Sequence, residues 1–299
     1  ILRADYVGLL ANGLPSDGHV LLNQIPLSAL SLGSILNNPI DSDVAVAAGI
    51  QKPYPSFEGS VAQALRPYPA FQMVNDLSSP TMNMQYHSLQ TTLQKRFGHG
   101  LNFLFAYTIS KTLANAGGFG GQGQASGGGD LQHTDQRGAL KGLFANDRPQ
   151  QINLSYLYEL PFGPGKRFGG GITNPVAKHL VGGWRLSAIQ HYWRESPIKV
   201  TTGAAVPGGL RSIWANREQG AIATGQGCGE YSRGDVSLNA GAFSVPGSFE
   251  LGDTRILPSF RPCGYMNENI SIQKIFPFRE RYKVEFAAEF INIFNRHNM

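Results

Sequence analysis

The chain has 299 residues, enough for one large all-β domain or two ordinary domains. Charged residues make up only 15%, below the roughly 25% of an average soluble domain, and glycine is abundant at 37 residues. The net charge of +5 is scattered, which argues against a nucleic-acid partner, and no apolar run approaches the roughly 18 residues of a transmembrane helix.

Alternating apolar and polar residues predict β-strands along the chain, because successive side chains of a strand point to opposite faces. Residues 101–110 are typical: Leu101, Phe103, Phe105, Tyr107 and Ile109 share one face, and mostly polar residues share the other. Further strands are expected at residues 86–97, 151–160, 183–195, 267–276 and 282–294, and residues 1–8 are expected to end another. A change of phase at Ala188-Ile189 predicts a bulge.

The connections between these strands alternate in length. Long loops are expected at about 9–85, 111–149 and 197–266, short turns at 98–100 and 277–281, and a moderate Pro- and Gly-rich turn at 161–182. All long loops therefore emerge at one end, which is the asymmetry of outer-membrane barrels. We predict an all-β fold, with antiparallel up-and-down strands forming part of a transmembrane β-barrel. The alternative is a soluble β-sandwich, because the pattern of a single hairpin fits either fold.

The long loops contain two features of their own. The Gly-rich run at residues 117–129 buries too little apolar area to be ordered unless a ligand or neighbour holds it, and it lacks the context of a phosphate-binding loop. Cys228 and Cys263 lie in the third loop and could close a ring of about 35 residues. We favour a disulfide, and hence an oxidising compartment, over two free thiols.

Candidate chemical groups are few. Asp130, His133 and Asp135 are possible metal ligands, although solvated polar residues are the commoner explanation for such a loop. Asp147 and Arg148, in the segment 146–149, are candidates to pair at the rim, where loop closure is favoured over ligand contact. No G-x-S-x-G elbow occurs, so we expect no catalytic residues, no cofactor and no enzymatic activity.

The two faces of a barrel strand assign further residues. On the polar face we expect lumen-facing side chains, namely Gln90, Gln94, Asn153 and Ser155. An aromatic girdle at the membrane interfaces is favoured over ordinary core packing for Tyr107, Tyr156, Tyr158, Trp184, Tyr192 and Trp193.

Several segments, in order, resemble a known family: YHSLQTTLQKRFGHGLNFLFAYTISKTL, NDRPQQINLSYLYELPFGPGKRF, GGWRLSAI and RYKVEFAAEFINIFN. They are similar to the C-terminal barrel portion of TonB-dependent outer-membrane receptors, in particular the Oar-like group with a carboxypeptidase-regulatory-like domain. The resemblance implies a barrel of about 22 antiparallel strands around an N-terminal plug. It also implies energy supplied by an inner-membrane energy-coupling complex.

The chain departs from this family pattern in two respects. It shows about seven strands, with no plug or coupling box near its start. It also reaches residue 299 where the family continues through another hairpin. We therefore expect residues 1–299 to be a partial β-barrel domain without the plug and the final strands.

The expected function is that of a receptor or transporter segment in the bacterial outer membrane, with its loops facing the exterior. It would bind or take up a large, unidentified nutrient. The partners would be outer-membrane lipid and, through the missing N-terminal part, the energy-coupling complex. A non-enzymatic surface or matrix protein that assembles through β-strand edges is the first alternative, and a secreted β-scaffold enzyme is the second.

Overall fold

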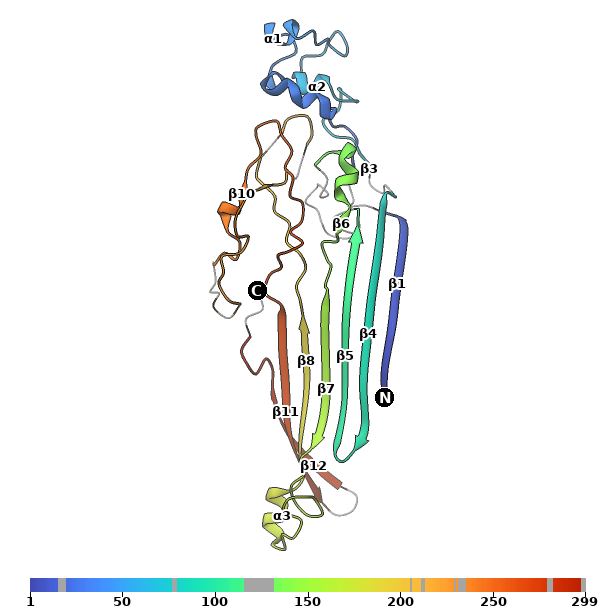
Figure 1. Ribbon diagram of the computed structural model, residues 1–299, viewed down its shortest axis with the longest axis vertical. Coiled ribbons are helices and arrows are strands. Elements are labelled where there is room, and N and C mark those ends of the chain that lie inside the picture. Colours follow the sequence, from blue (N-terminus) through green and yellow to red (C-terminus); the bar gives the residue numbers. More distant parts are fainter. Residues whose placement is uncertain are drawn as a thin grey trace.

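A single large antiparallel sheet dominates the computed structural model of the chain (Figure 1). The structure describes residues 1–15, 20–76, 80–115, 132–204, 206–210, 213–228, 230, 235–278 and 282–296. The long strands are β1 (Leu2–Leu14), β4 (Met82–Gly98), β5 (Leu101–Ala114), β7 (Gln150–Glu159), β8 (Trp184–Trp193), β11 (Tyr265–Phe278) and β12 (Tyr282–Phe290). They are hydrogen-bonded in this order, which is also their order along the chain.

Shorter elements occupy the connections. The helices are η1 (Leu27–Asn37), α1 (Asp43–Ala47), α2 (Val61–Ala64), η2 (Thr134–Leu140), α3 (Pro175–Val181) and η3 (Ala240–Ala242). The short strands are β2 (Val20–Leu21), β3 (Asn75–Asp76), β6 (Gly142–Leu143), β9 (Asn216–Arg217) and β10 (Phe243–Ser244). Of these strands, β6 joins the large sheet by pairing with β5. In the described part of the chain no helix is long and apolar enough to span a membrane.

The expected up-and-down arrangement of strands is confirmed, with small changes at the strand ends. Strand β12 ends at Phe290 rather than at residue 294, because Asn292 and Asn295 turn the chain with positive φ angles of 50° and 49°. The bulge expected at Ala188-Ile189 is wrong, since β8 pairs in continuous register with β7 and β11. Ala188 and Ile189 simply lie on opposite faces.

The register gives the sheet one apolar and one polar face. Phe105 lies opposite Leu93 and Leu154, whereas its neighbour Ala106 lies opposite Thr92 and Asn153. The apolar face comprises mainly Leu2, Tyr6, Leu10, Leu89, Leu93, Leu101, Phe103, Phe105, Tyr107, Ile109, Ile152, Leu154, Tyr156, Tyr158, Trp184, Leu186, Ala188, Tyr192, Met266, Ile270, Ile272, Phe276, Tyr282, Val284, Phe286, Ala288 and Phe290. Many of these side chains are exposed, so the sheet has an extensive uncovered apolar surface.

Five of the six aromatic residues expected in a girdle lie on this apolar face. Tyr107 and Tyr192 both lie opposite Ile152, near the loop end, and Trp184 lies at the other end of β8. Trp193 is the exception, because it faces the polar side and stacks on Tyr265 with ring centroids 3.8 Å apart. Its placement in the girdle is therefore wrong: residues 184 and 193 have opposite parity along one strand.

Among the described residues, the larger hydrophobic cluster lies in the loops, and a smaller one, with Met82, Ala114 and Phe144, lies at the loop ends of the strands. Residues 20–76 and the described residues of 198–257, which we call the cap, share a buried cluster that includes Ile25, Leu36, Phe57, Val61 and Ile213. Figure 1 shows the long connections gathered at one end of the strands, with α1 and α2 farthest from the sheet. The loop limits are close to those expected, but these two loops are packed against each other. The Gly-rich run at 117–129 lies outside the described residues.

The opposite end of the sheet carries short connections. His99 and Gly100 alone join β4 to β5, with φ angles of 55° and 77°. Two central residues with positive φ are the signature of a type I′ hairpin turn, which matches the twist of the strands. A Cβ atom at Gly100 would also lie 3.0 Å from the carbonyl oxygen of Glu159. The turn therefore requires glycine at this position.

Candidate functional site: the polar face and the loop cap

The four expected lumen-facing residues lie on the same polar face of the sheet. Gln90 and Gln94 belong to β4, and Asn153 and Ser155 belong to β7. They share this face with Asn102, Thr108, His191, Asn267 and Ser271, according to the strand register. The Oδ1 atom of Asn153 is 2.7 Å from Nδ1 of His191 on the adjacent strand. The sheet therefore offers a continuous polar surface that ends at the cap.

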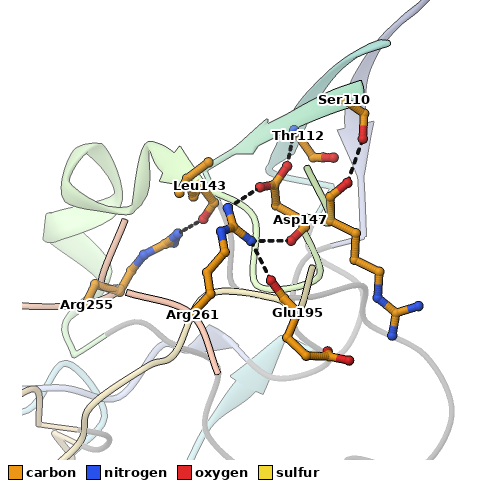
Figure 2. A network of polar contacts seen from close by, with 8 residues as sticks. Ser110, Thr112, Leu143, Asp147, Glu195, Arg255 and Arg261 are labelled. Atoms are coloured by element: carbon orange, nitrogen blue, oxygen red, sulfur yellow. Dashed lines mark hydrogen bonds and ion pairs between the residues drawn. The ribbon is translucent and has the colours of Figure 1, made fainter. Parts of the chain in front are cut away.

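A buried ion pair ties the segment that follows the cap in the third loop to the loop end of the sheet (Figure 2). The carboxylate of Asp147 is 1% exposed, and its Oδ2 accepts a 2.5 Å hydrogen bond from Nη2 of Arg261, whose side chain is 10% exposed. Its Oδ1 accepts from the backbone N–H of Thr112 on β5 at 2.6 Å. Arg261 also donates to the carbonyls of Asp147 and Glu195, at 2.6 and 2.9 Å. Two loops and a strand end thus meet at one carboxylate.

The segment 146–149 therefore closes a loop, as expected, but with a different partner. Asp147 pairs with Arg261 and not with Arg148, because its carboxylate points toward the third loop (Figure 2). Arg148 instead lies over the ring of Trp193, with its Cζ atom 5.0 Å from the ring centroid. The carbonyl of Arg148 accepts a 2.7 Å hydrogen bond from the hydroxyl of Ser110.

Two buried glutamines connect all three long loops. Gln132 donates to the carbonyl of Gly252 at 2.8 Å and accepts from the backbone N–H groups of Trp214 and Gly252, at 2.8 and 3.0 Å. Gln24, in the first loop, donates to the carbonyls of Gln132 and Gly209, at 3.2 and 3.3 Å. Because buried polar groups left unpaired are costly, these amides hold the loops in one arrangement.

His133 takes part in the same connection between loops. Its ring is almost fully buried; Nε2 lies 2.7 Å from the carbonyl oxygen of Ile25, and Nδ1 accepts from the N–H of Asp135 at 3.1 Å. Both ring nitrogens are therefore engaged within the protein. The proposed ligand Asp130 lies outside the described residues, among which no group of three or more His, Cys, Asp or Glu side chains is placed to hold a metal.

The structure joins Cys228 and Cys263 in a disulfide. Their Cα atoms are 5.5 Å apart, within the usual range for a bridge, and they are separated by 35 residues in sequence. The disulfide ties the outer part of the third loop to the segment that leads into β11. This is the pairing that the cysteine spacing favoured.

We expect the unreduced, denatured protein to show no reactive thiol from these two cysteines, because both sulfur atoms are in the bridge. Titration with a thiol reagent before and after reduction measures this directly. Two thiols from Cys228 and Cys263 should appear only after reduction. Two reactive thiols without reduction would show that the bridge does not form.

Comparison with protein families matches the whole chain to one model. The family described as "Outer membrane beta barrel domain" matches residues 1–299. The chain belongs to this family. Comparisons with curated proteins and with solved structures returned no match. The protein is therefore an outer-membrane β-barrel protein of the bacterial outer membrane, and its apolar face is the surface that meets lipid.

The dimensions of the apolar face agree with those of an outer-membrane barrel. Trp184 and Tyr192 mark the two ends of the apolar stretch of β8. Eight residue steps span about 27 Å along a strand. At a strand tilt of about 40° this gives roughly 20 Å of height, comparable to the ~25 Å apolar band of such barrels. The two aromatic positions thus lie where the membrane interfaces are expected.

One carboxylate lies on the lipid-facing side of this outer-membrane barrel sheet. Glu268 of β11 is opposite Gln190, is 2% exposed, and has its Oε1 3.3 Å from Nη2 of Arg296. The backbone N–H of Ile293 donates to the Glu268 carbonyl at 3.0 Å, which brings the segment after β12 alongside. A charge in this position requires a partner, and Arg296 supplies it.

Sequence reasoning missed the residues that hold the cap in place: Arg261, Gln132 and Gln24. Arg261 lies outside the alternating segments and belongs to no recognisable motif. The two glutamines are of a residue type that is common in loops. The one available signal was Asp147, which lies two residues before Pro149, at the end of a loop that leads into a strand. A carboxylate at that position indicates that a cationic partner lies nearby. Its partner is 114 residues away along the chain.

Proposed function

We propose that this outer-membrane barrel segment belongs to a TonB-dependent receptor, of the Oar-like group, that binds or takes up a large nutrient at the cell surface. The observation that carries the proposal is the packing of the first and third long loops into one cap at the loop end of a sheet with a polar face. Such a cap supplies a binding surface, and the polar face, with Gln90, Gln94, Asn153 and Ser155, supplies the wall of a passage. The order of the strand motifs supports the assignment.

Strand direction disfavours the alternative of assembly through sheet edges. Six antiparallel pairings separate β1 from β12, so the two edge strands run in the same direction. Joining β12 to β1, within one chain or around a ring of identical copies, would pair parallel strands. Pairing like edges across a two-fold axis would place the loops of the two copies on opposite sides of the membrane.

An all-antiparallel barrel that contains this sheet therefore needs an odd number of additional strands. In the proposal these strands, together with the plug, are supplied from outside the seven strands described here. No covalent chemistry is assigned to the chain, so the proposal is one of binding and transport. The inner-membrane energy-coupling complex would be its energy source.

The test is binding of the intact gene product to the energy-coupling protein. The protein is purified from outer membranes in mild detergent and mixed with the purified periplasmic domain of the coupling protein from the same bacterium. We expect saturable one-to-one binding, which a peptide carrying the receptor's coupling segment should compete. A barrel that is folded, judged by its heat-dependent electrophoretic mobility, but does not bind at all would contradict energy-coupled transport.

A further inference from the structure

The connection between β7 and β8 forms an ordered insertion at the turn end of the sheet. It contains α3 (Pro175–Val181), which lies beyond the strand ends and opposite the cap in Figure 1. The helix is capped by Asn174, whose Oδ1 accepts from the backbone N–H groups of Val176 and Ala177, at 2.9 and 3.2 Å. Pro175 occupies the first helical position, where its missing N–H costs nothing. The helix therefore has a defined start despite its short length.

Two side chains of the apolar face hold the other end of α3. Nε1 of Trp184 donates to the Leu180 carbonyl at 2.9 Å. Nζ of Lys274 donates to the carbonyls of Leu180 and Gly182, the former at 3.2 Å. Lys274 is 6% exposed, and its Nζ lies 4.8 Å from the ring centroid of Trp184. A lysine at a helix C-terminus satisfies the last carbonyls and the helix dipole.

The position of these side chains places α3 at the edge of the lipid-facing surface. Lys274 lies directly opposite Trp184 on β8 and Phe286 on β12, and Phe286 is exposed. The C-terminal end of α3 is thus on the apolar side of the sheet, at the level where Trp184 marks the interface. On the turn side of an outer-membrane barrel this is the periplasmic leaflet.

The helix divides into two faces of different character. Val176 and Leu180, four residues apart and so on one side of the helix, are 68% and 65% exposed. Lys178 and His179 line a cavity of about 530 Å³, together with the ion-paired side chains of Glu159, Lys166 and Arg185. Val176 and Leu180 do not line this cavity and are uncovered within the described protein.

We propose that α3 is an interfacial anchor that docks on the phospholipids of the periplasmic leaflet. Val176 and Leu180 enter the boundary between headgroups and acyl chains, at the level of Trp184 and Lys274. Lys274 is the positioning residue, because it ties the last turn of α3 to the sheet. The occupant is lipid because the Leu180 carbonyl is bound by Trp184 and Lys274, which lie on the sheet face that already meets lipid. The inference rests on membership in the outer-membrane barrel family and is independent of any transport role.

The test measures lipid contact with nitroxide spin labels. The intact protein is reconstituted in vesicles of phosphatidylethanolamine and phosphatidylglycerol, with a single label at Val176→Cys or Leu180→Cys. Val284→Cys is the lipid-exposed reference. Gly171→Cys, in the same insertion, is the water-exposed reference, since a Cβ there meets no atom within 4 Å. The ratio of collision rates with oxygen and with a water-soluble nickel complex reports the environment.

We expect both α3 labels to give ratios near that of Val284→Cys and several-fold above that of Gly171→Cys. Labels on α3 that match Gly171→Cys would overturn the proposal. In a Lys274→Met background, which keeps the packing but removes the hydrogen bonds, the label at Leu180→Cys should shift toward the water-exposed value. An unchanged ratio there would overturn the positioning role of Lys274. The heat-dependent mobility of each variant confirms that its barrel is folded.

Discussion

Phe105→Arg is expected to destabilise the membrane-inserted protein by about 2–4 kcal/mol, because it places a charge on the lipid-facing side near mid-membrane. Phe105 lies between Leu93 and Leu154 on the apolar face, in the middle of the apolar stretch of β5. Reversible unfolding of the intact protein from vesicles, followed by tryptophan fluorescence across a urea series, measures the loss.

The matched control is Ala106→Arg, one residue along the same strand. Ala106 lies opposite Thr92 and Asn153, so its arginine would extend over the polar face. We expect its effect on the free energy of unfolding to be much smaller than that of Phe105→Arg. Equal losses, or a larger loss for Ala106→Arg, would show that the two faces have been assigned incorrectly.

Asp147→Asn is expected to loosen the cap by about 3–5 kcal/mol, the usual cost of breaking a buried ion pair from one side. The substitution keeps the size of the side chain but leaves the Arg261 guanidinium, 10% exposed, without its counter-charge. Hydrogen exchange measured by mass spectrometry should show faster exchange in the segments around Asp147 and Arg261. The central residues of β5 and β7 should keep their protection.

Asp135→Asn provides the comparison for this prediction. Its carboxylate is 66% exposed and 3.6 Å from His133 Nδ1, so its loss should change protection little. If Asp147→Asn and Asp135→Asn exchange alike, the Asp147–Arg261 pair does not hold the cap in place. If Asp147→Asn instead unfolds the strands, the pair stabilises the sheet rather than the loops.

The strands could be predicted because their pattern is local. Each strand segment shows the period of two by itself. The lengths of the connections then distinguish the loop end of the sheet from the turn end. Parity alone also separates Trp184 from Trp193, so the assignment of Trp193 to the same girdle was avoidable. The assumed bulge at Ala188-Ile189 failed because a single apolar residue on the polar face, here Ile189, does not require a change of register.

The cap could not be predicted in the same way, since its contacts are non-local. Gln24 and Gln132 are 108 residues apart, and nothing in either segment indicates the other. The close approach of two backbones is a second non-local contact of this kind. A Cβ atom at Gly252 would clash with the backbone of Trp214, so the glycine is needed there. His133 illustrates the consequence, because a residue in a polar loop proved to be buried between loops.

The arrangement links structure to function through its two ends. The cap lies at the loop end of the strands, while the turn end carries a helix with exposed apolar side chains. Between them, the apolar face fits the thickness of the membrane. The binding proposed for the cap and the anchoring proposed for α3 therefore fall on opposite ends of the same strands.

Fluorescence quenching along β7 tests the central claim that the apolar face meets lipid. Single cysteines from residue 151 to residue 156 carry a bimane label, and the intact protein is placed in vesicles containing brominated phospholipid. Quenching should alternate with a period of two, strong at Ile152, Leu154 and Tyr156 and weak at Gln151, Asn153 and Ser155. Uniform quenching, or an alternation of the opposite phase, would contradict the account.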